Sequence, residues 1–140
     1  MSYIDQQLCV HFYMKTRLII RYHENQLRTQ LGMTYPNALV LLTLDEKETF
    51  FVDEISKRLC LDTGTLTPLL KKLQAKGYIE RKRNSQDERR VSVSLTAQGQ
   101  ACIDKIKTIF DQTAQKMNLP TDVKQHLLNA LMSINFDEKD

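Results

Sequence analysis

Hydrophobic residues recur every three or four positions over several long stretches of the chain, a spacing typical of amphipathic α-helices. The first stretch runs over residues 3–31 without proline or glycine and predicts one long helix, with Gly32 as its C-terminal cap. A second helix is predicted over residues 34–44, because Thr34 supplies an N-cap and a proline follows in the first turn. The apolar run 38–42 inside this helix is expected to be buried on most sides.

Two shorter helices follow, and the second of them has a capped start. Residues 51–61 place their apolar side chains on one face and predict a short third helix. Asp62 or Thr63 can cap a fourth helix, which Gly77 ends. The core side of the fourth helix consists of Leu66, Leu69, Leu70 and Leu73. Its opposite side carries short hydroxyl side chains first and lysines afterwards.

A β-hairpin and two further helices complete the chain. Residues 78–83 and 89–95 predict two strands, the second because valine and leucine alternate with serine. Residues 84–87 are of the types found in turns and connect the strands. Apolar residues at helical spacing then predict one helix that starts at Thr96 and another that starts at Pro120.

This order of elements predicts a mainly α fold with a small β-hairpin, the winged helix-turn-helix. Residues 34–95 form its DNA-binding region, in which the third and fourth helices are the helix-turn-helix and the hairpin is the wing. The long helices within residues 1–32 and 96–140 are not needed for that fold, so their apolar faces need another partner. A two-fold homodimer supplies it most economically, and we expect a single domain over residues 1–140 with dimerisation helices at both ends.

Length and composition exclude several other classes of protein. With 140 residues, 41% hydrophobic and 26% charged, the chain has the size and composition of one globular domain. Three cysteines without the spacing of a disulfide framework favour a reducing compartment. The first residues lack the basic region of a secretion signal, and no apolar run approaches the ~18 residues of a membrane span. We therefore expect a cytoplasmic protein with no membrane contact.

The net charge of +3 is distributed unevenly along the chain. Residues 57–90 hold ten basic and four acidic side chains, whereas the rest of the chain holds ten basic and thirteen acidic ones. The basic segment spans the fourth helix and the hairpin. One compact domain therefore carries a localised face suited to an anionic partner.

Several runs of this sequence resemble MarR-family transcriptional regulators. They are LDTGTLTPLLKKL at residues 61–73, the hairpin residues 81–83 and 87–89, and Leu95-Thr96 with Gly99 three residues on. Residues 7–9 with Tyr13, and residues 34–36, resemble the OhrR-like branch, which senses peroxides through a cysteine. The resemblance covers nearly the whole chain. The homodimer would place its two recognition helices about 34 Å apart on a pseudo-palindromic double-stranded DNA operator, and we expect repression by occlusion of a promoter.

DNA binding requires short polar side chains that reach base edges and cations that contact phosphates. In the fourth helix the expected DNA-binding residues are Thr63, Gly64, Thr65, Thr67, Lys71, Lys72 and Lys76. In the wing they are Arg83, Asp87, Arg89 and Arg90. The resemblance implies that Arg89, oriented by Asp87, enters the minor groove, where a narrow groove concentrates negative potential.

Cys9 and Tyr13 lie one helical turn apart and therefore on the same face of the first helix. The thiolate is the reactive form of cysteine, and phenolic hydroxyls that donate to sulfur would stabilise it. The resemblance implies that Cys9 reacts with hydrogen peroxide or an organic hydroperoxide, beside Tyr13 and Tyr35 of the partner subunit. A further family tyrosine falls at Tyr22 or at the next position, where this chain has His23. Oxidation to a sulfenic acid, followed by condensation with another thiol, would alter operator binding.

The other two cysteines have different expected roles. Cys102, in the first turns of the fifth helix, is a candidate resolving cysteine from the other subunit, and a small thiol is the alternative. Cys60, in the turn before the fourth helix, is expected to be packed. The three histidines show no metal-ligand spacing with one another or with the cysteines, so we expect no metal and no cofactor.

Three alternatives to a redox-responsive regulator stay open. A regulator of the same fold could bind a phenolic or other aromatic effector, with Cys9 inert. A thiol peroxidase could use Cys9, but the strand and helix alternation of a thioredoxin-like domain, a nucleophile triad and a phosphate loop are all missing, so we expect no enzyme. A purely structural helical dimer would show no salt-dependent affinity for DNA.

Overall fold

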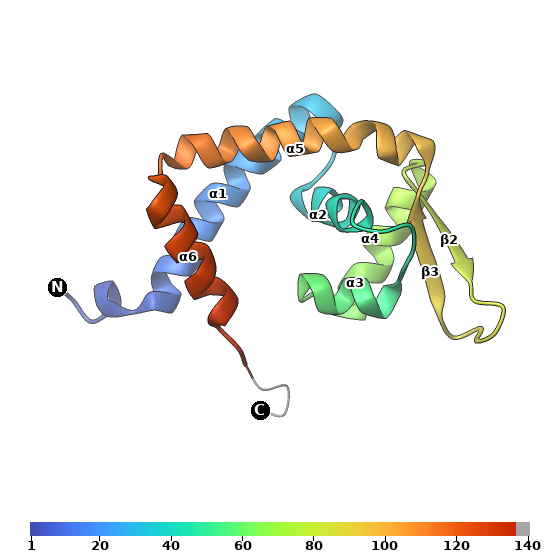
Figure 1. Cartoon of the computed structure of the whole chain (residues 1–140), viewed down its shortest axis with the longest axis horizontal. Coiled ribbons are helices and arrows are strands. Elements are labelled where there is room, and N and C mark those ends of the chain that lie inside the picture. Colours follow the sequence, from blue (N-terminus) through green and yellow to red (C-terminus); the bar gives the residue numbers. More distant parts are fainter. Residues whose placement is uncertain (137–140) are drawn as a thin grey trace.

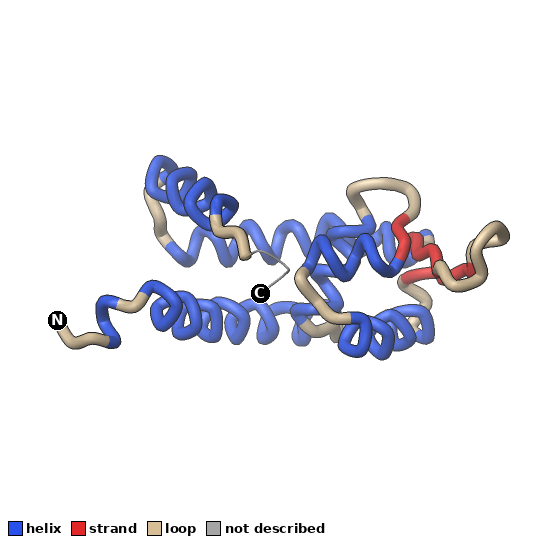
Figure 2. The backbone as a smooth tube through the Cα atoms, turned by 90° about the horizontal axis from the view of Figure 1, so that it is seen from below, coloured by secondary structure: helices blue, strands red, loops and turns tan. Residues whose placement is uncertain are grey.

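The computed structural model describes residues 1–136, which form six α-helices, one short 3₁₀ helix and a three-stranded antiparallel sheet (Figure 1). The elements are the 3₁₀ helix Ile4–Gln6, α1 Leu8–Leu31, α2 Tyr35–Leu44, β1 Phe50–Phe51, α3 Val52–Leu59, α4 Thr63–Ala75, β2 Ile79–Arg83, β3 Val91–Leu95, α5 Ala97–Met117 and α6 Thr121–Ser133. The start of α1 and α6 lie at one end of the molecule, and the sheet lies at the opposite end (Figures 1 and 2).

Three details differ from the prediction made from the sequence. Residues 3–31 do not form one helix, because Gln7 has an extended backbone that separates the 3₁₀ helix from α1. The wing has a third strand, since β1 pairs with β3 on the side away from β2. A two-residue strand is too short to show alternation in the sequence. Finally, α3 ends at Leu59 because Cys60 adopts a left-handed conformation with φ 53°.

The core lies between α1, α2 and α5 and extends under the helix-turn-helix. Its fully buried members include Leu27, Val40, Leu41, Ile55, Leu66, Leu70, Leu73, Ile103, Ile106 and Ile109. The run 38–42 is buried or half-buried throughout, as predicted. Each buried leucine or isoleucine contributes roughly 1.5–3 kcal/mol, so the three buried leucines of α4 hold that helix firmly and leave its other side free.

The wing is anchored where α4 ends and α5 begins. Thr96, the N-cap of α5, donates from Oγ1 to the carbonyl of Gly77 at 2.5 Å and accepts from the N–H of Gly99 at 3.0 Å. A Cβ at Gly99 would overlap the carbonyl oxygen of Tyr78, so only glycine permits this close approach. The junction therefore fixes the direction in which the wing leaves α4.

The end of the molecule opposite the wing keeps apolar faces uncovered. None of the residues of α6 is buried, and its exposed side includes Val123, Leu127, Leu128 and Leu131. The first half of α1 likewise exposes Leu8, Met14 and Leu18. An apolar helix face gains stability only when another surface covers it, so these two faces are candidates for an interface.

Candidate DNA interface and cysteine region

The first turn of α4 presents short polar residues to solvent. Its N-cap is Asp62, whose Oδ1 accepts a hydrogen bond from the N–H of Thr65 at 2.7 Å. This backbone hydrogen bond lowers the pKa of the Asp62 carboxyl, which is therefore charged at neutral pH. Thr63, Gly64 and Thr65 are exposed, whereas Leu66 behind them is buried. The cap and the core together hold the turn in a position to meet a partner.

The lysines near the end of α4 have different surroundings. Lys71 and Lys72 are exposed, and within residues 1–136 neither forms an ion pair. Lys76 follows the last helical residue, and its Nζ donates to the carbonyl of Gly32 at 3.4 Å. The structure thus gives Lys76 a contact with the C-terminal cap of α1, whereas Lys71 and Lys72 keep exposed ammonium groups.

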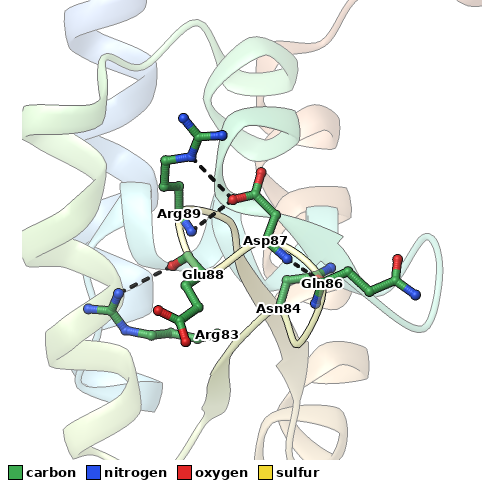
Figure 3. A network of polar contacts seen from close by, with 6 residues as sticks. All are labelled: Arg83, Asn84, Gln86, Asp87, Glu88 and Arg89. Atoms are coloured by element: carbon green, nitrogen blue, oxygen red, sulfur yellow. Dashed lines mark hydrogen bonds and ion pairs between the residues drawn. The ribbon is translucent and has the colours of Figure 1, made fainter.

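The tip of the wing is an ordered, hydrogen-bonded turn (Figure 3). Asn84 Oδ1 accepts from two backbone N–H groups of the turn, at 2.7 and 3.2 Å. Asp87 Oδ1 accepts from the N–H of Arg89 at 3.1 Å and from its Nε at 3.3 Å. Arg83 donates from Nη1 to the carbonyl of Glu88 at 3.2 Å. Asp87 thereby fixes the base of the Arg89 side chain, which remains 93% exposed.

Arg90 is placed differently from Arg89 beside it. Its guanidinium carbon lies 3.6 Å from the ring centroid of Phe51, and its Nη2 lies 3.4 Å from Asp53 Oδ1. These contacts tie β3 to β1 and the start of α3. Arg90, a predicted DNA-binding residue, therefore also holds the wing together.

Arg81 was not among the predicted residues, yet it faces the same surface. Its Nε donates to Gln74 Oε1 at 2.6 Å, which links the strand to α4. A depression of about 430 Å³ lies between α4 and the wing, and its lining includes Thr63, Thr67, Arg81, Arg89 and Arg90. Strand periodicity could have found Arg81, because residues two apart share a face and Arg83 was already selected.

Cys9 is exposed near the start of α1, on a face that is buried further along the helix. Eighteen residues, or five helical turns, separate Cys9 from Leu27, which is fully buried. Tyr13 is 64% exposed, and its hydroxyl accepts a hydrogen bond from Arg17, one turn further on, at 3.4 Å. Within residues 1–136, Cys9 Sγ has no hydrogen-bond partner. No described element covers the thiol.

The other tyrosines do not surround Cys9 within one chain. Tyr35 stacks on Phe110 with ring centroids 5.6 Å apart and contacts His23 at 5.0 Å. Burial raises the pKa of Tyr35. Tyr22 is half-buried and lines a groove between α1 and α5. A tyrosine shell around Cys9 would therefore need a second subunit.

The remaining cysteines differ from each other in exposure. Cys102 is half-buried and donates to the carbonyl of Gly99 at 3.1 Å, and burial raises the pKa of its thiol. The expectation that Cys60 is packed is wrong. Its left-handed backbone closes the helix-turn-helix turn, and its side chain is exposed. Residues 1–136 contain neither a cluster of three metal-ligating side chains nor a helix long and apolar enough to cross a membrane.

Comparison with known proteins identifies the family. Residues 23–106 match the family described as transcriptional regulator SarA/Rot. The chain belongs to this family. The HTH-type transcriptional regulator SarZ of Staphylococcus haemolyticus is 35% identical over 139 residues, which cover 97% of this chain and 94% of that protein. The relatives of this SarA/Rot-family chain are transcriptional regulators rather than enzymes.

Solved structures confirm the predicted fold of the SarA/Rot-family chain. Reduced AbfR bound to DNA aligns with a TM-score of 0.76 and 32% identity over 92% of this chain and 89% of that one. A MarR variant from E. coli complexed with operator DNA aligns with a TM-score of 0.81 and 26% identity, covering 94% and 97%. AbfR has also been solved in an overoxidized form on DNA and in a disulfide form. The fold is thus a MarR-like winged helix-turn-helix, mainly helical with a small sheet.

Proposed function

We propose that two copies of this chain bind a pseudo-palindromic DNA operator and repress transcription. The depression between α4 and the wing carries this proposal, because Thr63, Thr67, Arg81 and Arg89 line it. The exposed Lys71 and Lys72 lie on the same helix. A two-fold dimer would present that surface twice, about 34 Å apart, as successive major grooves require.

Each part of the surface has a role in this proposal. Thr63, Thr65 and Thr67 contact base edges or phosphates in the major groove, and Gly64 lets the backbone approach closely. Lys71 and Lys72 contact phosphates, as does Arg81, which lines the depression. Arg89 enters the minor groove with Arg83 beside it. The DNA complexes of AbfR and MarR support the general arrangement.

We also propose that oxidation of Cys9 regulates DNA binding. The Cys9 thiolate attacks one oxygen of a hydroperoxide, so that an S–O bond forms, the O–O bond breaks and an alcohol or water leaves after protonation. Sulfur is oxidised by two electrons and the peroxide is reduced. A second thiol then attacks the sulfenic acid and releases water. Burial and the raised pKa of Cys102 favour a small-molecule thiol over Cys102 of the partner subunit.

The position of Cys9 explains how its oxidation would change the affinity for the operator. The uncovered face of α1 that carries Cys9 continues into the buried face that packs on α5, so a second subunit covering it would sense an added group. Such a group would shift the dimerisation helices and with them the spacing of the two α4 helices. The reduced, overoxidized and disulfide forms of AbfR support a redox-active cysteine among the relatives.

One binding titration tests both proposals, the binding of operator DNA and its regulation by oxidation of Cys9. The affinity for an inverted-repeat promoter duplex is measured by fluorescence anisotropy with and without cumene hydroperoxide, for the native chain, Cys9→Ser and Cys102→Ser. We expect the oxidant to weaken binding by the native chain and Cys102→Ser at least tenfold and to leave Cys9→Ser unchanged. Absence of duplex binding in every sample contradicts the first proposal. Oxidant-insensitive binding by the native chain contradicts the second and favours an aromatic effector instead.

A further inference from the structure

His23 is a buried polar side chain with an incomplete set of hydrogen bonds. It lies on α1 with 4% of its surface exposed, and among the described residues its Nδ1 has no hydrogen-bond partner. Buried polar atoms in folded proteins are nearly always paired, because an unpaired one loses its hydration without replacement. A neutral imidazole tolerates this position when Nδ1 is the unprotonated nitrogen, whereas an imidazolium would bury an N–H donor that has no acceptor.

The His23 ring joins three helices. Its centroid lies 4.3 Å from that of Phe110 on α5 and 5.0 Å from that of Tyr35 on α2. Tyr35 and Phe110 are in turn stacked with an interplanar angle of 11°. This aromatic junction, His23 with Tyr35 and Phe110, connects the helices of the dimerisation end to α2. Since α2 packs on α3 and α4, the junction lies between the two functional ends of the molecule.

Few charged groups face the junction. Residues 35–44 of α2 contain none, and the residues of α5 that flank Phe110 towards the core are Ile106, Ile109 and Thr113. The charged neighbours Lys107 and Asp111 on α5 are exposed. On α1, Glu24 Oε1 accepts from the N–H of Tyr35 at 3.5 Å. The titratable groups next to His23 are therefore Glu24 and Tyr35, and burial alone lowers the pKa of His23.

We propose that protonation of His23 loosens the aromatic junction and thereby weakens operator binding at mildly acidic pH. A charged imidazole would bury an unpaired N–H donor beside the stacked rings of Tyr35 and Phe110, so the chain relieves this cost by separating α2 from α1 and α5. Separation changes where α4 is held relative to the dimerisation helices. The DNA readout rests on the proposed function, whereas the loosening is a property of the chain itself.

Proton linkage gives the direction in which the stability changes with pH. The pKa of a free histidine is 6.5, and the buried His23 has a lower one. Between the two values the opened or unfolded state binds more protons than the packed state, so stability falls as the pH drops below about 6.5 and is unaffected above it. One proton for each chain limits the change to about tenfold per pH unit in the equilibrium constant.

The experiment combines NMR, thermal unfolding and DNA binding on the full-length chain. The His23 pKa is read from its ring-proton shifts, and the unfolding temperature and operator affinity are measured from pH 7.5 to 5.5. The variants are His23→Phe, which keeps a ring in the junction without a titrating nitrogen, and the matched control His126→Gln on the exposed α6. We expect a His23 pKa below 6.5, and a fall in both stability and affinity for the native chain and His126→Gln that is absent from His23→Phe.

Three outcomes would overturn the inference. A His23 pKa at or above 6.5 means that the neighbouring rings stabilise the imidazolium rather than reject it. Equal acid sensitivity of the native chain and His23→Phe assigns the effect to other groups. Acid-sensitive unfolding with a constant operator affinity separates the junction from DNA binding. If the native chain binds no duplex at pH 7.5, the proposed function fails, while the NMR and unfolding measurements still decide whether the junction titrates.

Discussion

The wing end and the α6 end of this molecule differ in how much of a functional site one chain can build. At the wing end, caps and hydrogen bonds within residues 62–90 hold the polar turn, Arg81 and the base of Arg89 in place. At the α6 end, Cys9 is exposed and its tyrosines contact other residues or solvent. A charged surface that meets DNA can be completed by local sequence. The redox site that we propose around Cys9 would need groups from two chains.

The same difference shows in packing. Leu66, Leu70 and Leu73 of α4 are fully buried, whereas α6 buries none of its residues. The free energy that holds the DNA-binding surface is therefore available to a single chain, and the position of α6 depends on what covers it. Changes at the α6 end should act through association, and changes at the wing end should act directly on DNA.

The largest effect is expected from breaking the association. A carboxylate in Leu127→Asp would be buried in the interface that we propose, at a cost of several kcal/mol. We expect the variant to be monomeric in analytical ultracentrifugation and to lose at least a hundredfold in operator affinity. Asn129→Asp adds the same charge on the opposite side of α6 and should remain dimeric. A dimeric, fully active Leu127→Asp would show that another surface joins the two chains.

A smaller effect separates the two adjacent arginines of the wing. Removal of Arg89, which is exposed at the tip, should weaken operator binding by about 1–3 kcal/mol without changing the melting temperature. Arg90→Ala should instead lower the melting temperature, because it loses the contacts with Phe51 and Asp53. Anisotropy and thermal unfolding on both alanine variants measure the contrast. Equal effects of the two substitutions on DNA affinity would mean that the wing binds as a diffuse cationic surface.

The smallest effect concerns Arg81. As a phosphate contact it is expected to contribute to affinity equally for all sequences, so Arg81→Gln should weaken specific and non-specific binding alike, by a few-fold. It should also reduce the slope of log affinity against log salt by about 1. Gln74→Ala removes the side chain that holds Arg81 and should give a weaker version of the same change. An unaltered slope in Arg81→Gln would place this arginine outside the DNA contact.

Local patterns were sufficient to predict most of the fold. Caps such as Thr34 and Asp62, and the periodic leucines of α4, are read from a few neighbouring residues and appear in the structure. The strand β1 was not predicted, because a strand of two residues is too short to show alternation of apolar and polar side chains. The break in the first helix at Gln7 was not predicted, because residues 3–31 contain no proline or glycine that would indicate it.

The candidate site was predicted less completely, for physical reasons. Composition and spacing identify the basic side chains of the site. Whether such a side chain is available to a partner or already bonded within the chain depends on contacts with residues distant in sequence. Arg90 contacts Asp53, 37 residues earlier, and Lys76 contacts Gly32, 44 residues earlier. In the dimer that we propose, the surroundings of Cys9 would depend on a second chain and could not follow from local sequence patterns. The sequence shows His23 only as a departure from the family pattern, because its burial and its unpaired Nδ1 result from the packing of three helices.

The mass and salt dependence of the protein–DNA complex test the central claim most directly. A duplex selected from a randomised pool is bound by the native chain, its stoichiometry is measured by light scattering, and its affinity is followed from 50 to 200 mM salt. We predict two chains on each duplex and an affinity that falls by about 10³-fold or more over this range, as six or more phosphate contacts require. One chain on each duplex, or an affinity independent of salt, would contradict a basic surface presented twice.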